Sequence, residues 1–114
     1  MSNLAAKPQT PREYLAAGEA AFENGDKAVG CILFWKAVES TFAGLAESNG
    51  LDLNRNTLSQ VARAIDEKQG LELHYLGGLS IGQSMKHNAE FDYMGPNELE
   101  MVMNGVRKFV LKHA

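Results

Sequence analysis

The apolar residues of this chain recur at helical spacing along most of its length. The most apolar stretch runs from Cys31 to Val38, inside a helix predicted over residues 26–49. Because this stretch is apolar on nearly every side, the helix that contains it must be covered by other helices. The pattern therefore predicts an all-α fold, a four- to five-helix antiparallel bundle built around residues 26–49.

Capping residues mark where several of the predicted helices begin. Thr10 with Glu13, and Thr57 with Gln60, have the spacing of capping boxes at the starts of the first and third helices. Pro96 opens the last helix, since proline suits the first helical position. We expect the charged outer face of the third helix to be solvated: Arg63, Asp66, Glu67 and Lys68.

The domain organisation follows from these boundaries. Residues 1–9 show no periodicity and are predicted to form a flexible leader. Asp26 follows the first helix almost at once and can cap the second, so the two form an antiparallel hairpin. A chain of 114 residues is long enough for one core, which leaves residues 10–114 as a single helical-bundle domain.

The segment after the third helix gives an ambiguous pattern. Residues 71–88 have apolar positions at helical spacing, but Gly77, Gly78 and Gly82 interrupt them. Each glycine inside a helix costs about 0.5–1 kcal/mol relative to alanine. We expect one continuous helix whose glycines allow close approach to the central helix, and the alternative is a break at Gly77 and Gly78.

Composition narrows the classes of function. The formal net charge is −3, and hydrophobic and charged residues make up 45% and 22% of the chain. Such a chain gains little from the release of counterions, so any nucleic-acid contact requires a local basic patch. Cys31 is the only cysteine, which excludes an intramolecular disulfide. The start of the sequence lacks a charged region followed by an apolar run, so we expect a cytoplasmic protein without a membrane segment.

The most interesting polar residues lie close together near residue 90. Lys86, His87, Asn88 and Tyr93 are candidate ligand-binding residues that could contact a phosphate or a base. His87 is also the candidate catalytic residue, because a histidine with its ordinary pKa of about 6.5 suits proton transfer near neutral pH. The alternative is structural, with His87 and Asn88 capping the end of a helix.

The other histidines suggest no further chemistry. His74, His87 and His113 share no ligand spacing, so we expect no metal site, and no motif implies a cofactor.

The apolar central helix suggests an interface with another molecule. If the other helices leave part of it uncovered, a two-fold homodimer is the natural solution, with Ile32, Phe34 and Trp35 as candidate interface residues.

Two family resemblances accompany these patterns. The small and aromatic positions of the first hairpin resemble those of a single tetratricopeptide repeat: Gly18, Ala21, Gly25, Gly30, Phe34 and Ala37. A second resemblance begins with Trp35-Lys36-Ala37-Val38-Glu39 and continues in Leu45-Ala46-Glu47-Ser48-Asn49-Gly50-Leu51. These segments are similar to the second-helix signature of the PaREP-type proteins of the HEPN superfamily. Asn24-Gly25-Asp26-Lys27-Ala28 and the cluster of His87, Asn88, Phe91 and Tyr93 also resemble that family.

The HEPN resemblance implies a small helical bundle that commonly dimerises. Some members are metal-independent ribonucleases, and others bind nucleotides or nucleic acid beside a partner nucleotidyltransferase. The ribonuclease motif places an arginine or similar polar residue a few positions before a histidine. This sequence departs from it, because Arg63 is too distant and the segment between Lys68 and His74 contains Gly70.

Three hypotheses of function follow. The first is a non-enzymatic HEPN-like binding module for RNA or nucleotide that acts through residues 86–93. The second is a ribonuclease of the toxin type, with His87 as its general acid or base. The third is a protein-interaction scaffold with a single TPR-like hairpin.

Overall fold

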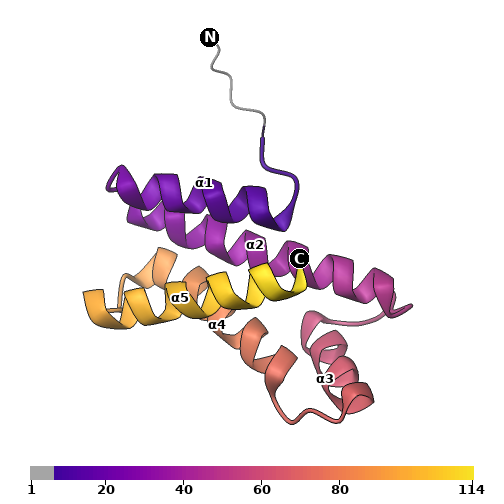
Figure 1. The fold of residues 1–114 in the computed structure, drawn as a ribbon. Coiled ribbons are helices and arrows are strands. Elements are labelled where there is room, and N and C mark those ends of the chain that lie inside the picture. The colour runs from indigo at the N-terminus through magenta and orange to yellow at the C-terminus, as the bar shows by residue number, and fades with distance from the viewer. Residues whose placement is uncertain (1–6) are drawn as a thin grey trace.

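The computed structural model describes residues 7–114, in which five helices account for most of the chain (Figure 1). The helices are α1 (Pro11–Glu23), α2 (Lys27–Ser48), α3 (Leu58–Gln69), α4 (His74–Phe91) and α5 (Pro96–His113). The described residues contain no strand, so the predicted all-α bundle is confirmed. Of the predicted leader, residues 1–6 lie outside the described residues, and residues 7–9 are not helical.

The central helix α2 contacts each of the other four helices. Figure 1 shows α1 lying along α2 on one side, α4 and α5 on the other, and α3 near the C-terminal end of α2. Phe34, Val38 and Phe42 are completely buried in this core. The other helices therefore cover most of the apolar stretch of α2, while Ile32 and Leu33 are only half-buried.

The first hairpin packs very closely because two glycines face two aromatic rings. A Cβ atom at Gly18 would lie 2.5 Å from the ring of Phe34, and one at Gly30 would lie 2.8 Å from the ring of Phe22. The two rings meet edge to face with centroids 5.3 Å apart. The small residues that give the hairpin its TPR-like pattern thus serve the contact between α1 and α2.

Helix α4 runs through Gly77, Gly78 and Gly82 without a break, which confirms the expectation of one continuous helix. It begins at His74 and ends at Phe91, so it starts later and ends later than the expected range of 71–88. Gly82 faces Val38 of α2, as expected, because a Cβ there would lie 2.7 Å from that side chain. Gly78 faces Phe109 of α5 instead, so the two glycines serve different neighbours.

The start of α4 is capped by a residue that we expected to be solvated. Asp66 of α3 is only 3% exposed, and its carboxylate accepts hydrogen bonds from the backbone N–H groups of Tyr75 (2.8 Å) and Leu76 (3.0 Å). The prediction of a solvated Asp66 is therefore wrong. A carboxylate at the N-terminus of a helix satisfies free N–H groups and complements the helix dipole, which stabilises its burial.

Helix α5 is fixed to α1 by an ion pair. The guanidinium of Arg107 donates two hydrogen bonds to the carboxylate of Glu19, at 2.7 and 2.8 Å. This bond raises the pKa of Arg107 above its ordinary value. Because Arg107 and Glu19 lie near opposite ends of the chain, the pair joins the two ends of the fold.

One described helix, α2, is long and apolar enough to cross a membrane. Its most apolar window has a mean hydropathy of 1.3, and 44% of that window is buried in the protein. The core helix of a soluble protein meets the same criterion. The expectation of no membrane segment stays a prediction.

Candidate functional site

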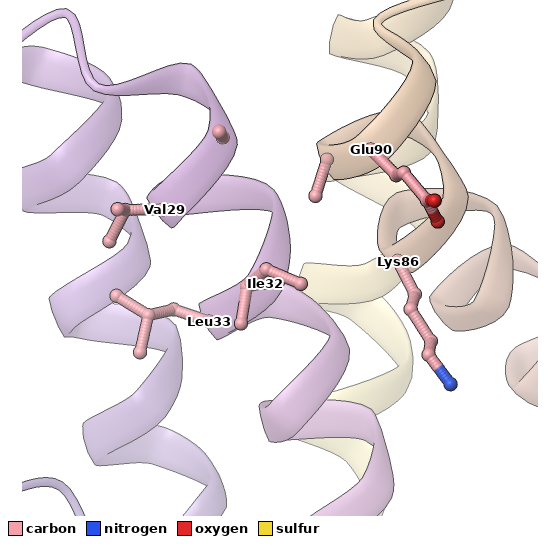
Figure 2. A pocket seen from close by; sticks show the side chains of 7 residues that line it. Val29, Ile32, Leu33, Lys86 and Glu90 are labelled. Carbon is pink, nitrogen blue, oxygen red and sulfur yellow. The ribbon is translucent and has the colours of Figure 1, made fainter.

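An apolar groove of about 420 Å³ lies on the surface between the first half of α2 and the second half of α4 (Figure 2). Its lining consists of Ala28, Val29, Ile32 and Leu33 from α2 and Lys86, Ala89 and Glu90 from α4. Val29 is 46% exposed, and Ile32 and Leu33 are half-buried. The other helices therefore leave part of the apolar surface of α2 uncovered.

Two opposite charges stand on the α4 side of the groove. Lys86 and Glu90 are both exposed and lie one helical turn apart, on the same helix (Figure 2). The ammonium group of Lys86 also lies 5.6 Å from the centre of the Trp35 ring, in a cation–π contact. Lys86, a predicted ligand-binding residue, thus borders an apolar surface.

The three candidate interface residues occupy different positions. Ile32 lines the groove and is accessible from outside. Phe34 is completely buried within the protomer, and Trp35 is 9% exposed. Phe34 is therefore a core residue beneath α1, and Ile32 is the candidate best placed to contact another molecule.

Asn88 points into the protein and is fully engaged there. It is 2% exposed, its side-chain oxygen accepts a hydrogen bond from the N–H of Met94 (2.8 Å), and its amide nitrogen lies 3.5 Å from Sγ of Cys31. Burial raises the pKa of the Cys31 thiol, while the Asn88 contact opposes that rise. Asn88 thus fixes the turn between α4 and α5, which is a structural role, although the residue that caps the end of α4 is Asp92.

His87 and Tyr93 lie on the outside. The His87 ring is exposed and makes no hydrogen bond with any described residue. Tyr93 is 52% exposed, and its hydroxyl donates a long hydrogen bond of 3.4 Å to the carbonyl of Ser84. The four candidate ligand-binding residues therefore do not converge on one site: Lys86 borders the groove, Asn88 is buried, and the exposed His87 has no hydrogen-bond partner among the described residues.

The groove itself carries a signal that sequence reasoning did not use. Its residues recur at spacings of three and four on both helices, which is the pattern of one helix face. Val29, Leu33 and Glu90 were missed because the face of α2 that stays open depends on where α4 lies. The structure shows that α4 covers one side of that helix and leaves this strip open.

The described residues offer little for metal-dependent chemistry. No group of three or more histidine, cysteine, aspartate or glutamate side chains among them is arranged to hold a metal ion. Comparison of the chain with family models, curated proteins and solved structures gives no match. The function is therefore argued from the groove and its charges.

Proposed function

We propose that this chain is a small, non-enzymatic, HEPN-like interaction module whose α2–α4 groove binds a second copy of the same chain. The observation that carries the proposal is the combination of an open apolar strip on α2 with opposite charges on α4. The apolar side chains on α2 would be removed from water on binding, which favours association: Val29, Ile32 and Leu33. Lys86 and Glu90 would fix the orientation of the second copy in the groove.

The charges favour a second copy as the occupant. In a two-fold arrangement whose axis is perpendicular to α4, the α4 helices of the two protomers run antiparallel, and the same patch meets itself. Lys86 of one protomer then lies opposite the partner's Glu90, and the reciprocal pair forms as well. A patch with one positive and one negative residue a turn apart is self-complementary in this arrangement. Like charges would instead face each other if the helices paired in parallel register.

The polar residues support binding rather than catalysis. General acid–base chemistry requires a proton-transferring group within hydrogen-bond reach of its partner. His87 has no such partner among the described residues, and Asn88 is occupied by the turn at Met94. The ribonuclease hypothesis therefore gains no support from this geometry. An RNA or nucleotide ligand, a nucleotidyltransferase partner and a cytoplasmic location stay predictions.

Charge reversal tests the proposed dimer. Lys86→Glu should place two acidic groups opposite each other in both reciprocal contacts, and Glu90→Lys should place two basic groups there. Each exposed contact is worth up to about 1 kcal/mol, so the loss of both should weaken association by up to about 30-fold. The double variant Lys86→Glu/Glu90→Lys restores both pairs and should associate as the parent does. Sedimentation equilibrium measures the dimer dissociation constant.

Arg63→Glu is the matched control, because Arg63 is an exposed cation on α3 outside the groove. It should leave association unchanged. A parent that is monomeric at all accessible concentrations would contradict the proposal. So would single reversals that behave like Arg63→Glu, or a double variant that is weaker than either single variant. Binding of a labelled short RNA by the parent and by Lys86→Ala separately tests the predicted nucleic-acid ligand.

A further inference from the structure

Two histidines that are distant in sequence meet where α4 begins and α5 ends. Nε2 of His74 lies 2.7 Å from Nε2 of His113, and both rings are half-buried. Tyr75 packs edge to face against His74, and Phe109 packs at a tilt against His113, each with ring centroids 4.9 Å apart. The aromatic contacts hold both imidazoles in place, so the short separation is a defined feature of the packing.

The geometry of the pair is that of a hydrogen bond. The two ring centroids lie 4.9 Å apart, close to the largest value that a nitrogen-to-nitrogen separation of 2.7 Å permits. Both nitrogens therefore lie almost on the line that joins the ring centres, so the N–H of one ring points at the lone pair of the other. Two imidazoles bound to one tetrahedral zinc ion would instead hold their nitrogens about 3.3 Å apart, which is longer than the separation in this pair.

This bond requires that at least one ring is neutral. A neutral imidazole has one donor and one acceptor nitrogen, whereas a histidine cation has two donors and no acceptor. If both rings carry the extra proton, both Nε2 atoms bear hydrogen and two positive charges face each other. We propose that the His74–His113 bond is a pH-sensitive latch that fastens the last turn of α5 to the first turn of α4, and that a second proton releases it.

The charged groups around the latch disfavour the doubly protonated form. Burial, the charge of His74 and the charge of Lys112 together lower the pKa of His113 from its ordinary value. Lys108 and Lys112 of α5 line the same surface hollow as His74. Glu72, two residues before His74, is exposed, and no ion pair joins it to either ring among the described residues. Asp66 of α3 is already bound to two N–H groups of α4.

The remaining sides of His113 carry no compensating anion. The phenol of Tyr75 donates its hydrogen to Gln69 at 3.3 Å, and Arg12 of α1 adds another cation near the end of α5. The residues of α2 that border the same hollow as His113 are uncharged: Ser40, Thr41, Gly44, Leu45 and Ser48. An extra proton on His113 would therefore find no acidic partner among the described residues.

The latch is one of few contacts that hold the end of α5. Val110 is completely buried, but the next residue, Leu111, is 48% exposed. Within residues 7–114, a long hydrogen bond of 3.3 Å from Arg12 to the carbonyl of Leu111 is the other polar tether of this turn to a different helix. A hollow of about 280 Å³ lies beside His113 and Ala114, so the last turn is loosely packed on that side. Its release would enlarge this hollow.

The direction of the pH effect follows from the lowered pKa. Once the turn opens, the pKa of His113 returns toward its ordinary value of 6.5, so the open form binds more protons than the closed form. The latch therefore contributes fully above pH 6.5 and weakens as the pH falls below it. For one extra proton, the opening constant rises by up to about tenfold per pH unit.

Amide hydrogen exchange, measured by NMR from about pH 7.5 to about pH 5, tests the latch. Protection factors, which are corrected for the intrinsic exchange rate, should fall several-fold to tenfold per pH unit at Lys112, His113 and Ala114. Imidazole ¹⁵N spectra should show one Nε2 without hydrogen above the transition and hydrogen on both below it. Protection at Val38 and Phe42 of the α2 core should not follow this profile.

Three variants separate the latch from a general acid effect. His74→Gln keeps a hydrogen-bond acceptor that a protonated His113 can still reach, so protection of the last turn should lose its pH dependence. His74→Ala should leave the turn open at every pH. His87→Gln removes an exposed histidine and should match the parent. The proposal is overturned if parent protection does not change, if His74→Gln follows the parent profile, or if both rings gain the proton while the turn stays protected.

Discussion

The two ends of α4 differ in how they use polar residues. At its start, Asp66 is buried and binds two backbone N–H groups, while His74 pairs with His113 of α5. At its end, His87 and Asn88 are neighbours in sequence, yet one is exposed and the other is buried. The C-terminal end of α4 has an obvious polar cluster in the sequence, but its side chains do not converge on one site. The N-terminal end shows no such cluster in the sequence, yet its polar side chains bind one another and the backbone.

The difference shows what adjacency in a helical protein means. Successive residues on a helix point in directions about 100° apart, so they do not face each other. Residues that do converge come from different helices, as His74 and His113 do across 39 positions of the chain. A polar cluster in a helical sequence therefore predicts a site only when its members share one face.

The largest effect should come from the capped start of α4. Asp66→Ala leaves the N–H groups of Tyr75 and Leu76 without their acceptor in a buried position. We expect a loss of about 3 kcal/mol in the free energy of unfolding, measured by urea denaturation. Glu67→Ala, at the exposed position next to it, should change stability by less than about 0.5 kcal/mol. Equal effects from both changes would mean that the carboxylate does not cap α4.

The adjacent glycines of α4 should respond in opposite directions. A Cβ at Gly78 would collide with the ring of Phe109, so Gly78→Ala should destabilise the protein by about 1–3 kcal/mol. No atom lies within 4 Å of a Cβ at Gly77, so Gly77→Ala should stabilise it by about 0.5–1 kcal/mol. Thermal unfolding of the two variants gives the comparison. A destabilised Gly77→Ala would indicate that this face of α4 is not open.

The end of α4 should show a smaller contrast. Asn88→Ala leaves the buried N–H of Met94 without a partner and should cost about 1–2 kcal/mol. His87→Ala should stay within about 0.5 kcal/mol of the parent, because the ring is exposed. Cleavage of a mixed RNA pool without added metal, by the parent and by His87→Ala, adds a functional readout. Activity that disappears in a folded His87→Ala would support the ribonuclease hypothesis and contradict the proposed non-enzymatic role.

Local signals in the sequence predicted the helices well. The capping boxes at Thr10 and Thr57 are both present, and Gly70 ends α3 with a positive φ of 69°. These features depend on residues within one turn of each other, which a sequence displays directly. The continuity of α4 through its glycines was also predictable, because the apolar spacing persists on either side of them.

The candidate site was less predictable because it depends on long-range contacts. The carboxylate of Asp66 binds N–H groups nine and ten residues further along the chain, and no pattern marks that pairing. The prediction of solvent exposure was based on the charge of Asp66, because charged side chains are rarely buried unless they have a partner. The open strip at Val29 could be recognised only once the position of α4 was known.

The closely packed α1–α2 hairpin also has a consequence for how the chain is made. Contacts between neighbouring helices form early, because little chain entropy is lost in closing a short turn. As the polypeptide leaves the ribosome, α1 can cover one side of the apolar α2 before the rest of the chain is synthesised. The Arg107–Glu19 pair, whose partners lie 88 residues apart, must wait for the final helix. Until then, the surface of α2 that α4 and α5 later occupy is the part of the nascent chain most exposed to aggregation.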